Sequence, residues 1–304
     1  MSSIRTLRTF LAVARHGSFA AAGSEIGLTA AAVGQQVRAL EQELHLQLFD
    51  RSARAIVLNT AGRGMVAPVM ELVGRYEALA ARPGDAQLSG TVVMGALVSA
   101  LMGAFADCLW ALKKRHPALE VTLLAGQSAD FARRVERGEL DAAVVTQPPA
   151  RLASSLVWTP LYSEPMVLIV PRRPHFEMPQ QPLAILSQCP FIRFDHQLWT
   201  GQLVAEVIAT CGASVQDAME LNSVEAIIAL VRQGFGVSVV PQLANVQWSR
   251  DRALRIVALD GVMVQRHVGL LERRQHSRQR FTQAIKDHFL KGAARCEGPA
   301  QTRL

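Results

Sequence analysis

The 304-residue sequence has only four cysteines, and they are far apart. No CxxC pair and no Cys/His cluster with ligand spacing occurs around Cys108, Cys189, Cys211 or Cys296. Structural zinc sites use closely spaced thiolate and imidazole ligands, so this pattern predicts no structural metal. We also expect no bound cofactor.

Long apolar segments and enzyme signatures are absent as well. No apolar run is long enough to cross a bilayer, and Arg5 and Arg8 are not followed by the apolar core of a signal peptide. The sequence shows no Ser–His–Asp signature, no P-loop and no GxGxxG after a strand, and Gly234-Phe235-Gly236 is too short for a dinucleotide fingerprint. These absences predict a cytoplasmic protein that has no membrane partner and is not an enzyme.

Length and charge set further limits. The length of 304 residues suggests about two domains, and a hydrophobic share of 50% allows sizeable cores. Six of the seven net positive charges come from the segment that begins at Arg266, where nine Lys and Arg residues oppose three acids. The basic balance is therefore weak evidence for nucleic-acid binding, and we expect residues 293–304 to be a disordered tail.

Residues 7–62 carry the strongest motif. Apolar residues recur at steps of three and four between Leu7 and Ala14, which predicts an amphipathic helix. Ser18 can cap a second helix, Gly27 can supply a tight turn, and Thr29 can cap a third helix that ends near residue 44. A short helix, a turn with glycine and a longer helix are typical of a helix-turn-helix, whose second helix enters a DNA groove.

This region resembles the DNA-binding domain of LysR-type transcriptional regulators. The resemblance rests on Phe10 with Val13, Gly17-Ser18-Phe19 followed by Ala21-Ala22, Ala32-Val33, Leu40-Glu41, Leu48-Phe49 with Arg51, and Leu58 with Ala61-Gly62. It implies an N-terminal all-α winged helix-turn-helix over residues 1–59. It also implies an operator of double-stranded DNA and, as a further partner, RNA polymerase.

Polar groups and small residues on the third helix and the wing are the candidate DNA contacts. Gln suits adenine edges, Arg suits guanine edges or phosphate, and alanine methyls can touch thymine methyls. Ala30 and Gly34 depart from the family, in which Gln and Ser are usual, and His45 and Asn59-Thr60 depart from it too. The candidates are Ser18, Thr29, Ala30, Ala31, Gln35, Gln36, Arg38, Arg51 and Arg54.

Residues 60–84 read as a linker helix and a hinge. An apolar seam recurs at steps of three and four, and we expect it to pair with the same helix of a second subunit, giving a dimer or tetramer. Pro68 should kink the helix, and Arg82-Pro83-Gly84-Asp85 reads as the hinge. The expected seam is Val66, Val69, Val73 and Tyr76.

Residues 85–292 alternate between strand and helix patterns, which predicts a parallel, doubly wound sheet. The phrases at residues 137–144, 166–171 and 231–237 resemble the effector-binding domain of the same family, which is α/β, two-lobed and similar to periplasmic binding proteins. We place lobe I at about 89–162 and 267–292, and lobe II at about 163–266.

In open parallel sheets, ligands bind beyond the carboxyl ends of strands and near helix N-termini. Hydroxyls and free N–H groups there suit a small effector, such as an anion. The candidate effector contacts are Ser99, Ala100, Gln127, Ser128, Thr146, Gln147, His196, Ser223 and Phe235.

Two other functions are kept open. Cys189 and Cys211 lie in the second lobe, where peroxide-sensing relatives carry a redox pair, so a thiol-redox regulator is one alternative. The other is a solute-binding protein, because the two-lobed fold is shared. The missing signal peptide and the attached helix-turn-helix argue against it.

Overall fold

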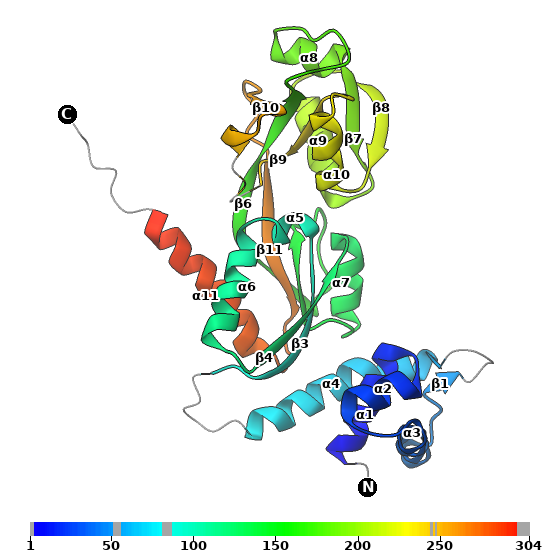
Figure 1. The fold of residues 1–304 in the computed structure, drawn as a ribbon. Coiled ribbons are helices and arrows are strands. Elements are labelled where there is room, and N and C mark those ends of the chain that lie inside the picture. The colour runs from blue at the N-terminus through cyan, green and yellow to red at the C-terminus, as the bar shows by residue number, and fades with distance from the viewer. Residues whose placement is uncertain (1–2, 51–55, 81–86, 244–245, 247, 297–304) are drawn as a thin grey trace.

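The computed structural model describes residues 3–50, 56–80, 87–243, 246 and 248–296. Figure 1 shows a small helical domain, a long helix that runs beneath a first α/β lobe, and a second α/β lobe above it. None of the helices in the described part of the chain is long and apolar enough to cross a membrane. The expected hinge at residues 82–85 lies outside the described residues.

The N-terminal domain has the predicted helices, and its hydroxyl caps explain where they begin. The side chain of Ser18 accepts a hydrogen bond from the backbone of Ala21, and Thr29 accepts one from Ala32. A two-stranded antiparallel wing completes the domain. Its elements are α1 (Ile4–His16), α2 (Phe19–Ile26), α3 (Ala30–Leu44), β1 (Phe49–Asp50) and β2 (Val57–Leu58).

The linker helix α4 (Thr60–Ala80) corrects the expected dimer seam. Val66, Val69 and Val73 are buried in the core of their own N-terminal domain, together with Phe10 and the residues around it. They cannot also pair with a second subunit in this conformation. The apolar periodicity correctly predicted an amphipathic helix, but its buried face packs within one chain. An amphipathic helix buries its apolar face against the nearest apolar surface. Tyr76, by contrast, is half exposed.

Lobe I builds its core from three parallel strands and the helices around them. β3 pairs with β4 and with β5, both in parallel. The helical stretch after β3 is divided into two helices, separated at Met102 and Gly103. The elements are β3 (Gly90–Ala96), α5 (Val98–Leu101), α6 (Ala104–Arg115), β4 (Leu119–Ala125), α7 (Ser128–Glu136), β5 (Ala142–Thr146) and the C-terminal α11 (Gln279–Cys296). α11 therefore includes residues 293–296, which the sequence had placed in a disordered tail, and the rest of that tail lies outside the described residues.

Lobe II is a second α/β unit around its own core. β7 and β8 are parallel, whereas β9 and β10 pair antiparallel with β6. The elements are β6 (Leu156–Pro171), α8 (Pro182–Gln188), β7 (Pro190–Phe194), α9 (Trp199–Thr210), β8 (Gln216–Leu221), α10 (Val224–Arg232), β9 (Ser238–Pro241), the short 3-10 helix η1 (Trp248–Arg250) and β10 (Leu254–Val257). The chain then returns to lobe I through β11 (Gln265–Arg273), which pairs with β5.

Two long antiparallel strands, β6 and β11, join the lobes. The main sheet has the order β10-β6-β11-β5-β3-β4, with β9 also on β6, and both β6 and β11 run from one lobe into the other (Figure 1). The expectation of a wholly parallel sheet is therefore wrong. The sheet is mixed because the chain crosses between lobes on adjacent strands of opposite direction.

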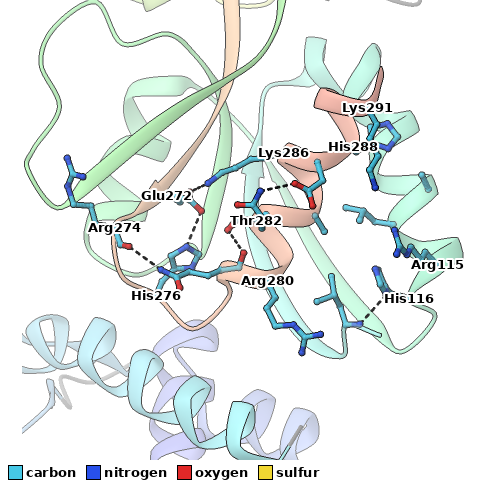
Figure 2. A pocket seen from close by; sticks show the side chains of 17 residues that line it. Arg115, His116, Glu272, Arg274, His276, Arg280, Thr282, Lys286, His288 and Lys291 are labelled. Atoms are coloured by element: carbon cyan, nitrogen blue, oxygen red, sulfur yellow. Dashed lines mark hydrogen bonds and ion pairs between the residues drawn. The ribbon is translucent and has the colours of Figure 1, made fainter. Parts of the chain in front are cut away.

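A buried carboxylate ties α11 to β11 at the foot of lobe I. Glu272 accepts hydrogen bonds from Lys286 and from Nε2 of His276, the latter at 3.1 Å (Figure 2). Burial alone would raise the pKa of Glu272, but hydrogen bonds from His276, Lys286 and Thr282 outweigh burial and hold this pKa at about 2. The charged carboxylate therefore stabilises the folded state.

We predict that Gly34→Ala and Gly23→Ala will change the stability of the helix-turn-helix in opposite directions, because the space around the two glycines differs. A Cβ on Gly34 would meet the Phe19 ring at 3.4 Å, an ordinary contact, so Gly34→Ala should stabilise α3 by about 0.5–1 kcal/mol. A Cβ on Gly23 would lie 2.4 Å from the carbonyl oxygen of Leu28, so Gly23→Ala should destabilise the turn by about 1–3 kcal/mol. Amide hydrogen exchange of α3 peptides measures both, and equal shifts in one direction would contradict the packing.

We predict a pH dependence from Glu272. Its folded pKa is depressed to about 2 from an ordinary value near 4.5, so its stabilisation is present above pH 4.5 and is lost as pH falls towards 2. Glu272→Gln should therefore lower stability by about 3 kcal/mol at pH 7, and by progressively less below pH 4.5. Thermal unfolding between pH 7 and pH 3 tests this, with Glu136→Gln on the exposed side of α7 as control. A deficit independent of pH would argue against the assignment.

Candidate DNA interface and interlobe site

The third helix of the N-terminal domain presents the polar side chains expected of a DNA reader. Gly27 adopts a left-handed backbone with φ of 70°, which allows the turn from α2 into α3. Gln35 and Arg38 are exposed one turn apart on α3, and Ala30 and Ala31 are exposed at its start. An exposed guanidinium and amide on a capped helix after a tight turn can hydrogen-bond base edges and phosphates.

Three other predicted DNA contacts are held within the domain. The Oε1 atom of Gln36 accepts a hydrogen bond from the buried hydroxyl of Thr9 at 2.6 Å, so this carbonyl joins α3 to α1 and is not available to an adenine edge. The hydroxyls of Ser18 and Thr29 cap the N-termini of α2 and α3, respectively. Arg51 and Arg54 lie outside the described residues, between β1 and β2 of the wing.

The second candidate site lies where the two lobes meet. Glu164 on β6 stands directly opposite Arg266 on β11, and each side chain is 1% exposed. Nε of Arg266 donates to Oε2 of Glu164 at 2.9 Å, and Nη2 donates to the same oxygen. Nη1 donates to Oγ of Ser99 at 3.0 Å. Ser99 thus lies beside the crossing strands, and its hydroxyl oxygen already accepts a hydrogen bond from a buried arginine.

Hydroxyl groups and one amide join the lobes directly. The Oγ1 atoms of Thr146 at the end of β5 and of Thr200 at the start of α9 are 3.3 Å apart. Nε2 of Gln127 in lobe I donates to the carbonyl of Asn222 in lobe II at 2.8 Å. Ser128 supports this group from behind, because its Oγ accepts the backbone N–H of Thr146 at 3.2 Å. The lobes are therefore in contact through groups that could also bind a polar ligand.

Two predicted effector contacts are wrong. The methyl group of Ala100 is fully buried in the core of lobe I, and its N–H donates to the carbonyl of Leu97. Phe235 lies after α10, at the opposite end of that helix from Ser223, and its ring meets His175 edge-on at 6.4 Å. The turn Gly234-Phe235-Gly236 therefore follows the C-terminus of α10, away from Ser223. The rule that ligands bind beyond the carboxyl ends of strands and near helix N-termini does not apply to this end of the helix.

The remaining predicted contacts lie around the interlobe region without pointing to one pocket. Gln147 is exposed, and its N–H donates to the carbonyl of His267. Ser223 caps α10 by accepting the N–H of Ala226 at 3.2 Å, and its hydroxyl donates to Glu225 at 2.6 Å. Sequence reasoning missed Arg266, Glu164 and Thr200. Glu164 and Arg266 are single charged residues next to apolar strand segments, and this pattern could have predicted a buried ion pair.

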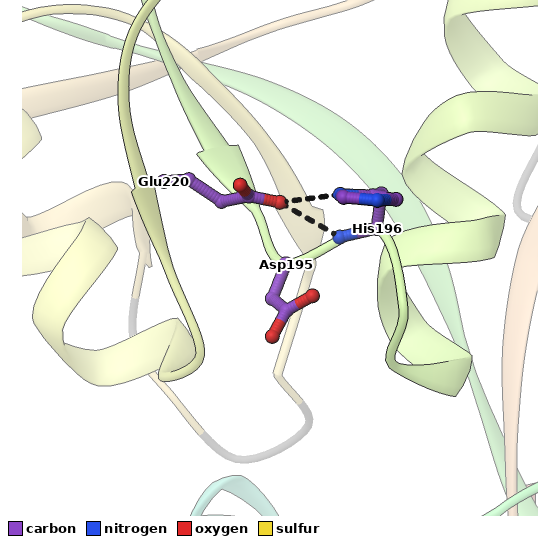
Figure 3. A group of neighbouring side chains, drawn as sticks. All are labelled: Asp195, His196 and Glu220. Carbon is purple, nitrogen blue, oxygen red and sulfur yellow. Dashed lines mark hydrogen bonds and ion pairs between the residues drawn. The ribbon is translucent and has the colours of Figure 1, made fainter.

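Figure 3 shows a cluster of Asp195, His196 and Glu220 on lobe II, in which one potential metal-ligand atom from each residue lies within 4.8 Å of the others. Nδ1 of His196 lies 2.7 Å from Oε1 of Glu220, and the backbone N–H of His196 donates to the same oxygen. These hydrogen bonds lower the pKa of Glu220. The Asp195 carboxylate turns away and accepts the N–H of Gln197. The His196 side chain is 62% exposed, so the cluster is a hydrogen-bonded surface group that holds the loop after β7.

The thiols give little support to redox chemistry. Cys189 is buried, Cys211 is partly exposed, and neither forms a disulfide. Burial raises the pKa of both thiols. Because the thiolate is the reactive form, this environment disfavours reaction with an oxidant at neutral pH.

Comparisons with known proteins agree with both halves of the chain. Residues 4–63 match the model of the bacterial regulatory helix-turn-helix protein of the lysR family, and residues 85–294 match that of the LysR substrate binding domain. The HTH-type transcriptional regulator IlvR of Caulobacter vibrioides is 30% identical over 244 residues, which cover 78% of this chain and 82% of that protein.

Two solved structures share the fold. A full-length OxyR variant of Pseudomonas aeruginosa has a TM-score of 0.75 at 20% identity and covers 95% of each chain. Full-length CbnR in complex with its target DNA has a TM-score of 0.59 at 20% identity, and the match covers 96% of this chain and 99% of that one.

The attached helix-turn-helix separates this chain from solute-binding proteins with a similar two-lobed fold, and relatives named as transcriptional regulators separate it from enzymes. A capped reading helix and a two-lobed α/β domain lie in one chain, and both match models of one family over almost its whole length. The protein belongs to the LysR-type transcriptional regulators.

Proposed function

We propose that α3 reads a partly palindromic DNA operator in the major groove, and that a small effector held between the lobes alters this binding. The observation that carries the proposal is the exposed pair of Gln35 and Arg38 on a helix that begins at a capped turn. The complex of CbnR with its target DNA supports it by similarity of fold. A DNA-binding regulator works where the DNA is, which supports a cytoplasmic location.

We expect Arg38→Ala to weaken operator binding by about 1–3 kcal/mol if the guanidinium reads a base, because a bidentate contact to guanine is lost. Binding to operator and to random duplexes should be titrated at one salt concentration, after the operator has been mapped genome-wide. Arg133→Ala is the matched control, since Arg133 is an exposed arginine on α7 of lobe I. Unchanged affinity of the Arg38 variant for both duplexes would refute the assignment.

The effector site is proposed where Thr146 and Thr200 meet. Their hydroxyls and the Gln127 amide come from elements that reach the interlobe boundary, and each makes a single neutral contact across it. Neutral hydrogen bonds contribute about 0.5–1.5 kcal/mol each, so a ligand with carboxylate or hydroxyl groups can replace them and move the lobes. The ligand changes operator binding only if it binds the two lobe arrangements unequally.

Thr200→Val keeps the side-chain volume and removes the hydroxyl, so we expect about a tenfold loss of effector affinity with operator binding unchanged. Thermal-shift screening of organic acids, amino acids and aromatic compounds identifies the effector, and calorimetric titration then measures its affinity. Thr210→Val is the control, because Thr210 lies at the other end of α9 and its hydroxyl only donates to the carbonyl of Glu206 in the same helix. Wild-type affinity in the Thr200 variant would place the pocket elsewhere.

Self-association is proposed through the exposed face of α4. Pro68, Leu72 and Tyr76 are exposed at steps of four, beside the stripe of buried valines, and the residues Leu72 and Tyr76 are 53% and 52% exposed. This row is the apolar surface that α4 leaves for a second copy of the chain. A twofold pair of helices would bring two reading helices to the two halves of a palindrome.

Leu72→Asp should weaken the dimer at least tenfold, because it places an unpaired charge in the apolar row. Analytical ultracentrifugation from 0.1 to 10 μM, as an order-of-magnitude range, measures the association. Arg75→Gln, at a neighbouring exposed position on α4, is the control. Association of the Leu72 variant at the wild-type level would show that the interface uses another surface.

A further inference from the structure

A basic groove lies at the foot of lobe I, away from the interlobe boundary. It has a volume of about 740 Å³ and lies between α6 and α11 (Figure 2). This volume is within the range that small-molecule sites occupy. Five Lys or Arg residues line the groove, against two acidic residues.

Both acidic residues are engaged by their neighbours. Glu272 accepts hydrogen bonds from Lys286 and His276, and Asp287 accepts one from Nε2 of Gln283 at 2.8 Å. The ion pair with Lys286 compensates the charge of Glu272, whereas Asp287 keeps its negative charge at the groove wall. Arg115, Arg280 and Lys291 on the two helices outnumber this single acid.

The cations that face this opening come from two different helices. Arg115 ends α6, and Arg280 and Lys291 belong to α11 (Figure 2). All three are exposed. Arg280 and Lys291 are eleven positions apart, about 16 Å along α11, so the three cations suit an extended polyvalent anion in which each contacts a different oxygen.

The behaviour of His116 agrees with a positive potential here. Burial, and then the charges of Arg115 and Arg280, lower the pKa of His116. Its Nδ1 accepts the backbone N–H of Leu88 at 3.1 Å, which leaves the hydrogen of the neutral ring on Nε2. The imidazole therefore adds no negative group to the groove.

The groove also borders the contact between lobe I and the linker helix. Ser277 follows His276 of the groove wall and packs against Gly74 of α4 so closely that a Cβ on Gly74 would lie 2.0 Å from the Ser277 side chain. Leu88, another lining residue, closely follows residues 82–85, where the sequence predicts a hinge. A ligand here would lie beside the junction that orients the DNA-reading domain.

We propose that this groove is a second ligand site, separate from the interlobe site, and that it binds a phosphate-bearing small molecule through Arg115, Arg280 and Lys291. Phosphate presents three oxygens and up to two negative charges, which match guanidinium and ammonium donors from two helices. The proposal does not depend on the effector site between the lobes.

Titration calorimetry of the full chain with sodium pyrophosphate and with inorganic phosphate tests the proposal, at constant ionic strength set with sodium chloride. We expect saturable binding of pyrophosphate at one site per chain. Arg115→Gln combined with Lys291→Gln should weaken it at least tenfold, and both positions are exposed enough to be changed without loss of fold. Arg133→Gln combined with Arg137→Gln, two exposed arginines on the same lobe, should leave it unchanged.

Absence of saturable binding, or equal affinity in the two double variants, would overturn the proposal. Operator affinity measured in phosphate-free buffer separates a free phosphate ligand from DNA phosphates. If the Arg115 and Lys291 double variant loses operator affinity while pyrophosphate does not saturate the wild type, the groove contacts DNA and the proposal fails. Thr200→Val should bind pyrophosphate normally, so failure of the interlobe effector site would be seen separately.

Discussion

The buried pair of Arg266 and Glu164 is the interaction on which the two-lobed domain depends. An arginine keeps its charge in proteins, so its burial at the crossing of β6 and β11 requires a carboxylate directly opposite. Removing either partner of such a pair leaves an uncompensated charge in the interior, which costs about 3–5 kcal/mol. The third donor, Nη1, reaches Ser99 and thereby fixes the start of α5 to the crossing strands.

This fixed crossing contrasts with the weak contacts farther out. The hydroxyls of Thr146 and Thr200 and the amide of Gln127 join the lobes by neutral hydrogen bonds, which water or a ligand can replace at little cost. The domain therefore combines a buried ion pair, at the strands that connect the lobes, with neutral hydrogen bonds between the lobes that a ligand can replace. Such a combination suits rotation of one lobe against the other about β6 and β11.

The linker helix packs closely on both of its sides. Val66, Val69 and Val73 make α4 part of the DNA-reading domain. On the other side, a Cβ on Gly138 would lie 2.6 Å from the Cβ of Ala67, so lobe I approaches α4 with no space between them. Gly138 has φ of 76°, which glycine adopts without strain. The foot of lobe I and the reading helix are thus joined by packed elements.

Local patterns in the sequence determined the helices of the reading domain, because caps such as Ser18 and Thr29 and the turn glycine act on neighbouring residues. The same holds for the strands and helices around Val92, Val144 and Val239, whose apolar runs mark buried elements. Alternation of elements also predicted two lobes, although it did not reveal that the crossing strands are antiparallel.

Only the tertiary structure decided which surfaces these elements bury and which polar groups meet. The valine stripe of α4 has the same periodicity whether it faces its own domain or a second subunit, and three-dimensional proximity selected the former. Glu164 and Arg266 are separated by 102 positions, and Thr146 and Thr200 by 54, so no local pattern could pair them. Sequence thus determined the elements through short-range interactions, whereas chain crossing and long-range packing determined the site.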